Sequence, residues 1–121
     1  MVMEMKSVGR HLIVELWQCQ GLDDPEMCEK TLKEAVEKAG ATLISLKVHR
    51  FNPHGLTGIA VIAESHISIH TWPELNYAAV DIFTCGENVD PLRAVEPFLE
   101  WLKPQHTQMM EIRRGVISNG R

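Results

Sequence analysis

Four β-favouring segments follow one another between residues 41 and 85 with only short turns between them, and this succession restricts the fold more than any other feature. The segments span residues 41–51, 57–63, 65–72 and 77–85. Connections this short join antiparallel neighbours, because parallel strands need a long crossover. The run therefore predicts an antiparallel sheet, to which residues 11–18 and 106–113 add two more strands, the last of them at an edge.

Two helices are predicted by one repeated device. Asp24-Pro25 and Asp90-Pro91 each place a good N-cap before a proline suited to the first turn. Apolar residues then recur at spacings of three and four, ending at Gly40 in the first helix and at Lys103-Pro104 in the second. Pro97 should kink or shorten the second helix. The expected fold is α+β, a two-layer sandwich of an antiparallel sheet with two helices on one face, in the order β-α-β-β-β-β-α-β.

Size and composition exclude several classes of protein. A chain of 121 residues suits a single domain, 1–121, and pairing with a second copy would enlarge its small core. A net charge of −4 argues against nucleic-acid binding, and no apolar run approaches the ~20 residues of a membrane span. The start lacks the apolar stretch of a signal peptide, and three widely spaced cysteines form no disulfide framework. We therefore expect a cytoplasmic protein with at least one free thiol.

Residues 63–74, Ala-Glu-Ser-His-Ile-Ser-Ile-His-Thr-Trp-Pro-Glu, are unusually polar for a buried strand. His66 and His70 have the spacing of a helical zinc motif, but the alternating isoleucines indicate a strand. Residues four apart on a strand are separated by roughly 13 Å, which one ion bonded at ~2.0 Å to each nitrogen cannot bridge. We therefore expect no metal.

The same segment holds candidates for nucleophilic chemistry. Ser65 and His70 are five residues apart, so on a flat strand they face opposite ways. They can meet only across an interface between two chains or where a bulge turns the strand. Cys85 ends another strand, and its pattern favours a small buried hydrophobe, although Gly86 beside it leaves room for a second molecule. The residue pattern alone leads to an antiparallel α+β domain with a polar central strand, and leaves its chemistry open.

Four motifs resemble those of the small prokaryotic S-adenosylmethionine decarboxylase proenzymes. They are G-R-H-L at 9–12, H-R-F at 49–51, residues 63–74, and D-I-F-T-C-G at 81–86. The resemblance runs from about Lys6 to Gly115, and the family usually begins near residues 5–7, so we expect residues 1–4 to be an extension or to precede an alternative start. It implies a lyase that converts S-adenosylmethionine to its decarboxylated form plus carbon dioxide, supplying the aminopropyl donor for spermidine. It also implies a covalent pyruvoyl cofactor, with no metal and no pyridoxal phosphate.

The resemblance further implies that the chain cleaves itself. Ser65 attacks the carbonyl of Glu64, and the resulting ester eliminates to leave a β chain of residues 1–64 and an α chain of residues 65–121. The consumed serine becomes the pyruvoyl group, which forms a Schiff base with the amine of the substrate. Attack on the preceding carbonyl requires a strained bend at Glu64.

Other residues take their roles from the same resemblance. His70 moves a proton in processing, and Thr57, where the family has a serine, binds the processing oxyanion. Cys85 is the proton donor in catalysis, which replaces its interpretation as a buried hydrophobe. Substrate contacts are expected from Glu74 on the ribose, Phe51 on the adenine, Trp17 as its aromatic partner, and Trp72 as a wall of the site or a packing residue.

The resemblance also implies a homodimer of αβ units with sites at the interface. Ser65 and Cys85 then come from one protomer, and Phe51, Thr57, His70 and Glu74 come from the other. Two alternatives remain open: a pyruvoyl-dependent arginine or ornithine decarboxylase, and a non-catalytic dimeric binding module that is never cleaved.

Overall fold

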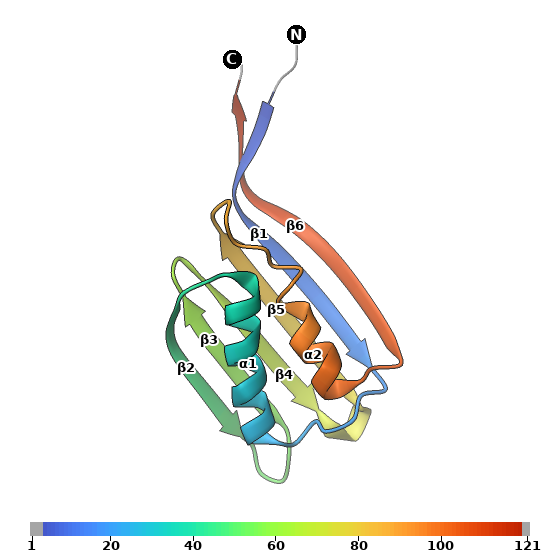
Figure 1. The fold of residues 1–121 in the computed structure, drawn as a ribbon. Helices are drawn as coiled ribbons and strands as arrows, with labels where there is room; N and C mark the ends of the chain where they lie inside the picture. The colour runs from blue at the N-terminus through green and yellow to red at the C-terminus, as the bar shows by residue number, and fades with distance from the viewer. Residues whose placement is uncertain (1–3, 120–121) are drawn as a thin grey trace.

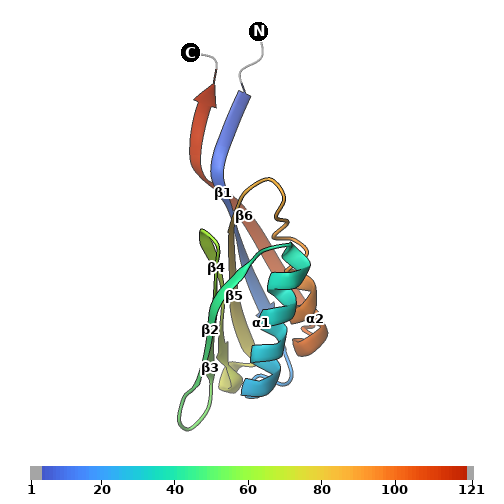
Figure 2. The ribbon, with the colours of Figure 1, turned by 60° about the vertical axis from the view of Figure 1, so that its left-hand side comes forward.

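A computed structural model describes residues 4–119, so most of the expected extension at residues 1–4 lies outside the described part. Six strands form one antiparallel sheet in the order β2-β3-β4-β5-β1-β6, and two helices lie together on one of its faces (Figures 1 and 2). The α+β class and the element order are confirmed. The elements are β1 (Glu4–Trp17), α1 (Pro25–Ala39), β2 (Leu43–Arg50), β3 (Leu56–Ile62), β4 (Ser65–Trp72), the 3-10 turn η1 (Pro73–Leu75), β5 (Tyr77–Cys85), α2 (Val95–Leu102) and β6 (His106–Asn119).

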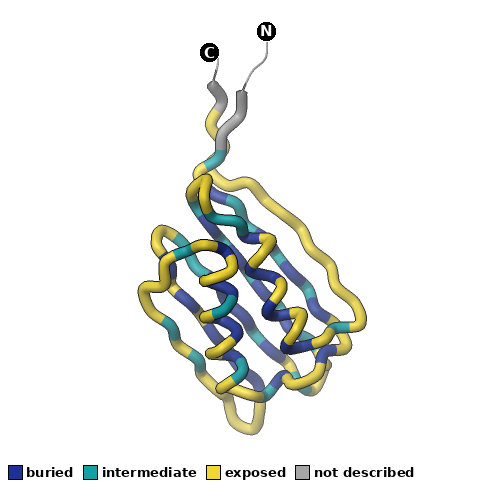
Figure 3. Tube along the Cα trace, viewed as in Figure 1, coloured by how far each residue is buried: buried dark blue, intermediate teal, exposed yellow. Residues whose placement is uncertain are grey.

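The core lies between the helices and the sheet (Figure 3). Ile67 and Ile69 of β4, Leu32 of α1 and Phe98 of α2 are fully buried there. Burying such a side chain contributes about 1.5–3 kcal/mol. Gly58 lets α1 approach the sheet, because a Cβ at this position would stand 2.8 Å from the Sγ of Cys28. The alternation of β4 therefore turns His66, Ser68, His70 and Trp72 to the face without helices.

The second helix begins later than its sequence predicts. Asp90-Pro91 does start a turn, in which the Asp90 side chain accepts from the Leu92 N–H at 3.0 Å. The bonds that follow connect residues three apart, from Ala94 to Pro91 and from Val95 to Leu92, each at 3.2 Å. The α-helix proper starts at Val95. This start places Pro97 in the first turn of a helix shorter than predicted, where its missing N–H leaves no helical bond unmade.

The first and last strands of the chain, β1 and β6, are longer than predicted. β1 and β6 pair with each other from Glu4↔Asn119 to Trp17↔His106. Beyond the rest of the sheet they continue as a two-stranded ribbon that carries both ends of the described chain (Figure 1). Mutual pairing satisfies their backbone hydrogen bonds outside the helix-covered region, which a local sequence window does not reveal.

Candidate active site

A strained bend separates β3 from β4. Glu64 has φ 67°, in the left-handed region that side-chain-bearing residues rarely adopt. The Ser65 Oγ donates to the Ala63 carbonyl at 3.4 Å. Strain of this kind costs roughly 1–3 kcal/mol and persists only where the surrounding structure holds it. Here the ladder between β3 and β4, which begins with Ile62 opposite Ser65, holds the bend at the residue before the serine.

A thiol lies against the carbonyl of the same residue. The Cys85 Sγ donates to the Glu64 carbonyl oxygen at 3.4 Å. Ser65 and Cys85 line one cavity of about 260 Å³, which is also bordered by the segment after α1 and the loop after β5. Cys85 is partly exposed, whereas Cys19 and Cys28 are buried. Interpreting Cys85 as a buried hydrophobe is therefore wrong, because β5 ends at this residue and the helices do not cover it.

Burial keeps the other two thiols protonated. It raises the pKa of Cys19 to about 11 and that of Cys28 to about 12. A thiol in that state is a poor nucleophile near neutral pH. Cys85 is thus the thiol with access to solvent and to the strained bend.

A second group of side chains lies at the other end of β4. Thr57 and His70 are register partners on β3 and β4, and the Thr57 Oγ1 lies 3.0 Å from the His70 Nδ1. Phe51, Trp72 and Glu74 join them around a cavity of about 350 Å³. Glu74 sits in η1, where its Oε1 lies 3.5 Å from the Nδ1 of His54.

The two groups do not meet within one chain. Ser65 and His70 stand near opposite ends of a continuous strand, and five residues of strand span roughly 17 Å. The structure therefore brings Ser65 together with Cys85, and His70 together with Thr57. It does not bring the first pair to the second.

The aromatic residues near the His70 end of β4 form two separate contacts. Trp17 stacks on Tyr77 at 4.3 Å, and Tyr77 stacks on Trp72 at 5.3 Å, so Trp17 is two rings away from the second cavity. Phe51 instead contacts His49, with ring centroids 4.6 Å apart. Within one chain, Trp17 and Phe51 do not form the expected aromatic pair.

Sequence reasoning assigned no role to two histidines that have acidic partners in the fold. The His11 Nε2 lies 3.0 Å from the Asp81 Oδ1, on the face of the sheet without helices. His54 lies beside Glu74, as described above. The partners are distant along the chain, so only the inclusion of His11 in the G-R-H-L motif could have drawn attention to it. Tyr77, whose hydroxyl donates to Glu15, was also missed; burial, followed by this hydrogen bond, raises its pKa to about 12.

Two further observations concern residues 4–119 only. Nowhere in that part of the chain do three or more His, Cys, Asp or Glu side chains gather as metal ligands would. Neither α1 nor α2 is long and apolar enough to cross a membrane.

The tight hairpin between β3 and β4 thus holds a serine directly after a left-handed residue, with a thiol at the carbonyl of that residue. The S-adenosylmethionine decarboxylase family model matches residues 10–115. The chain belongs to this family, and the family predicted from its motifs, with the enzyme class EC 4.1.1.50, is confirmed.

Relatives match over nearly their whole length. An S-adenosylmethionine decarboxylase proenzyme of Methanococcus maripaludis is 55% identical over 118 residues, which cover 96% of this chain and 97% of that protein. One from Thermomicrobium roseum is 50% identical over 114 residues, covering 93% and 98%. The crystal structure of the adenosylmethionine decarboxylase from Aquifex aeolicus VF5 superposes with a TM-score of 0.86 at 35% identity, covering 96% and 98%.

Proposed function

We propose that this chain cleaves itself between Glu64 and Ser65 and that the mature protein decarboxylates S-adenosylmethionine, supplying the aminopropyl donor for spermidine. The observation that carries the proposal is the left-handed Glu64 before Ser65, with the Cys85 thiol 3.4 Å from its carbonyl oxygen. Family membership gives this geometry its chemical meaning. The single domain, 1–121, would thus become a β chain of residues 1–64 and an α chain of residues 65–121.

The proposed cleavage needs water but no oxidant and no metal. The Ser65 Oγ adds to the Glu64 carbonyl carbon, and the Ser65 nitrogen leaves, so that an ester replaces the amide. Removal of the Ser65 α-proton then expels the Glu64 carboxylate and leaves dehydroalanine. Water replaces the nitrogen of its imine tautomer, which yields a pyruvoyl group and ammonia. Relief of the strain at Glu64 favours the first addition.

The residues around Ser65 fit the pyruvoyl group that would form there, because they line a cavity and include a thiol. When present, that group supplies an electrophilic ketone that accepts the electrons left as carbon dioxide departs. Cys85 would return a proton from its Sγ to the α-carbon of the substrate, since a thiol is a usable acid near neutral pH. His70 would move the proton during processing, and the hydroxyl of Thr57 would bind the oxyanion.

The separation of the two groups favours a homodimer in which each site is shared. A two-fold axis that reverses β4 places the His70 end of one copy against the Ser65 end of the other. The face without helices also exposes large apolar side chains, as protein interfaces do: Trp17, Ile59, Val61, Trp72, Met110 and Ile112. Ser65 and Cys85 would then act with Phe51, Thr57, His70 and Glu74 of the partner.

The second cavity suits a nucleoside better than an amino-acid side chain. Phe51 offers a ring for the adenine, and Glu74 offers a carboxylate that can accept hydrogen bonds from both ribose hydroxyls. Trp72 lines the same cavity, and an aromatic face attracts a sulfonium cation. Trp17 would contribute only through the stack with Tyr77 and Trp72. An arginine or ornithine decarboxylase would need Ser65, His70 and Cys85 but not a ribose-binding acid.

Denaturing mass spectrometry combined with carbon dioxide release tests the proposal. We expect two fragments that meet at 64/65, the second bearing pyruvoyl, and release of carbon dioxide from S-adenosylmethionine but not from arginine or ornithine. A single intact mass after long incubation would instead support the binding module. Release from arginine or ornithine alone would support the rival decarboxylase. The cytoplasmic location stays a prediction.

A further inference from the structure

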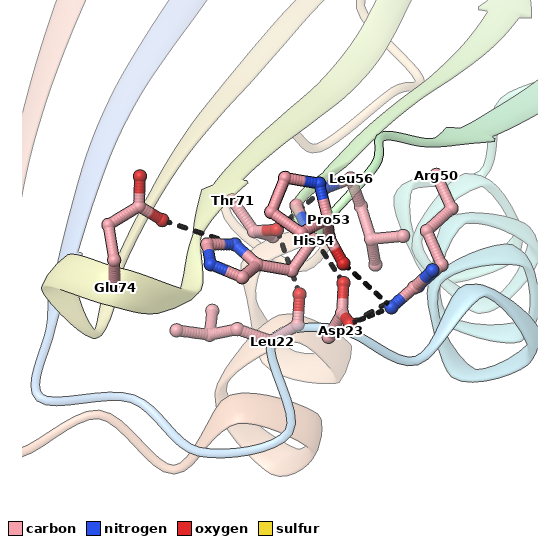
Figure 4. Close-up of polar contacts among 9 residues, drawn as sticks. Leu22, Asp23, Arg50, Pro53, His54, Leu56, Thr71 and Glu74 are labelled. Carbon is pink, nitrogen blue, oxygen red and sulfur yellow. Dashed lines mark hydrogen bonds and ion pairs between the residues drawn. The ribbon is translucent and has the colours of Figure 1, made fainter.

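One carboxylate outside the second cavity holds both ends of the loop that borders it. The Asp23 Oδ2 accepts from the Arg50 Nη2 at 2.6 Å and from its Nε at 3.2 Å (Figure 4). The Asp23 Oδ1 accepts from the Gly55 N–H at 2.8 Å. Arg50 ends β2 and Gly55 precedes β3, so Asp23, in the segment before α1, closes the loop between these strands from outside.

The loop itself has few other restraints. The Phe51 N–H donates to the Gly55 carbonyl at 2.8 Å, and the Arg50 Nη2 also donates to the Pro53 carbonyl at 3.3 Å. Gly55 has φ 108°, a conformation that favours glycine. Glycine is also the most flexible residue, so its own backbone does not hold the loop in place. Residues 51–54 are exposed, so packing against the core does not fix them, and only Gly55 at the end of the loop is buried.

The segment that carries Asp23 is itself anchored. The buried Thr71 hydroxyl donates to the Leu22 carbonyl at 2.8 Å and accepts from the Leu56 N–H at 2.9 Å (Figure 4). One side chain of β4 thereby connects the segment before α1 to the start of β3. Asp23 thus projects from a fixed point and can impose a position on the loop.

The loop in turn reaches the substrate contacts. Phe51 and His54 both line the cavity, and the His54 Nδ1 is 3.5 Å from the Glu74 Oε1. Thr57 and His70, in contrast, are held by ladder pairing between β3 and β4. Loosening the loop should therefore disturb Phe51 and Glu74 and leave the processing pair in place.

We propose that Asp23 is a positioning residue for substrate binding: by holding Arg50 and Gly55, it sets where Phe51 and His54 stand beside Glu74. The inference rests on the proposed function, because it assigns the adenosine half of the substrate to this cavity. A loop that is already ordered loses less conformational entropy when the substrate binds. Holding the loop should therefore increase substrate affinity. The Arg50 guanidinium and the Gly55 N–H also lower the pKa of Asp23, so the carboxylate stays ionised at neutral pH.

The test uses Asp23→Asn, which keeps the shape and one acceptor for Gly55 but points an amide at the donors of Arg50. We expect complete self-cleavage at a rate within about twofold of the parent. KM for S-adenosylmethionine should rise about tenfold and kcat should change less than about threefold. The Kd of 5′-methylthioadenosine, a probe of the adenosine half, should rise by about the same factor as KM. Arg50→Lys, which cannot make the paired bonds to Asp23, should raise KM in the same direction.

Glu111→Gln is the matched control, because it breaks another paired arginine–carboxylate contact, from Arg10 at 2.9 Å, between β1 and β6. It should leave KM and the Kd of the probe unchanged. The proposal is overturned if fully cleaved Asp23→Asn and Arg50→Lys keep the parental KM and Kd. It is also overturned if kcat alone falls, or if the control raises KM equally. Failure of the proposed function shows differently, as a parent chain that stays uncleaved or releases no carbon dioxide.

Discussion

The two ends of β4 differ in which part of the chain carries the candidate functional groups. At the Ser65 end the reactive element is the main chain, bent at Glu64 to φ 67° with one thiol against its carbonyl. At the His70 end the backbone is regular, and the functional groups are side chains placed by the ladder, as in the 3.0 Å contact between Thr57 and His70. A rigid strand of roughly 17 Å keeps the two apart. Under the proposed function, one copy would hold the bond to be broken and, at the other end of β4, a separate set of groups that acts on a partner.

The largest expected effect concerns sharing between copies. Ser65→Ala and His70→Ala chains should each stay uncleaved alone, because each lacks one half of the processing site. Co-expressed, they should yield cleaved His70→Ala chains, since the Ser65→Ala partner supplies the histidine. Mass spectrometry detects the fragments, and carbon dioxide release follows the activity. Mixtures that contain no cleaved or active species would show that the two ends of β4 do not cooperate across an interface.

The next largest effect is expected for Cys85, at the Ser65 end of β4. Cys85→Ser should cleave itself but lose about 10²–10⁴-fold in kcat, because a hydroxyl is a much weaker acid than a thiol. Iodoacetamide at pH 8 should likewise modify Cys85 first in the parent, since burial raises the pKa of Cys19 to about 11 and that of Cys28 to about 12. Peptide mapping identifies the labelled residue. Normal kcat in cleaved Cys85→Ser would remove this thiol from catalysis.

A smaller effect, on the cleavage rate, is expected for Thr57 at the His70 end of β4. Thr57→Val removes the hydroxyl and keeps the shape, so cleavage should slow about 10²-fold, the size expected for a lost oxyanion donor. Thr57→Ser keeps the hydroxyl and should cleave at a rate close to that of the parent. The time course of the intact band on a denaturing gel measures both. An unchanged rate in Thr57→Val would assign the oxyanion to another group.

The smallest effect concerns stability beside the second cavity. The pKa of Asp23 is lowered in the fold, first by Arg50 and then by the Gly55 N–H. Its contribution to the free energy of unfolding is therefore present above its unfolded-state pKa of about 3.9 and is lost as pH falls through the lower folded-state value. Urea unfolding between pH 5 and 3 should show a steeper loss for the parent than for Asp23→Asn. Parallel curves would contradict an ionised, paired Asp23.

Local signals predicted the first helix well and the second only in part. Asp24 caps α1 by accepting from the Met27 N–H at 3.1 Å, and Gly40 ends it with φ 78°, as the sequence indicates. Asp90-Pro91 carries the same signal, yet α2 starts at Val95. Before this helix, the Asp90 N–H donates to the carbonyl of Ala39, the last residue of α1, at 2.9 Å. Such a contact is invisible to a rule that considers only neighbouring residues.

The candidate site divides in a similar way. Motifs identified Ser65, His70 and Cys85, because each sits in a recognisable run of residues. No motif pointed to the pairing of His54 with Glu74 or to the contact of Asp23 with Arg50, since these contacts join residues that are distant along the chain. Trp17, expected as the aromatic partner of Phe51 on the adenine, stacks on Tyr77, its register partner in the β1–β5 ladder. Register between strands decides such neighbours, and it depends on the whole sheet.

The amino-acid sequence by itself determined the strand character of residues 65–72, and with it the separation of Ser65 from His70. It also determined the family, because the motifs can be recognised in the sequence alone. Only the tertiary structure decided that Cys85 meets the carbonyl of Glu64 and that Asp23 holds the loop beside Glu74. The physical reason is that alternation along a strand is a local property of the backbone, whereas contacts between side chains require turns and strand register to bring distant segments together.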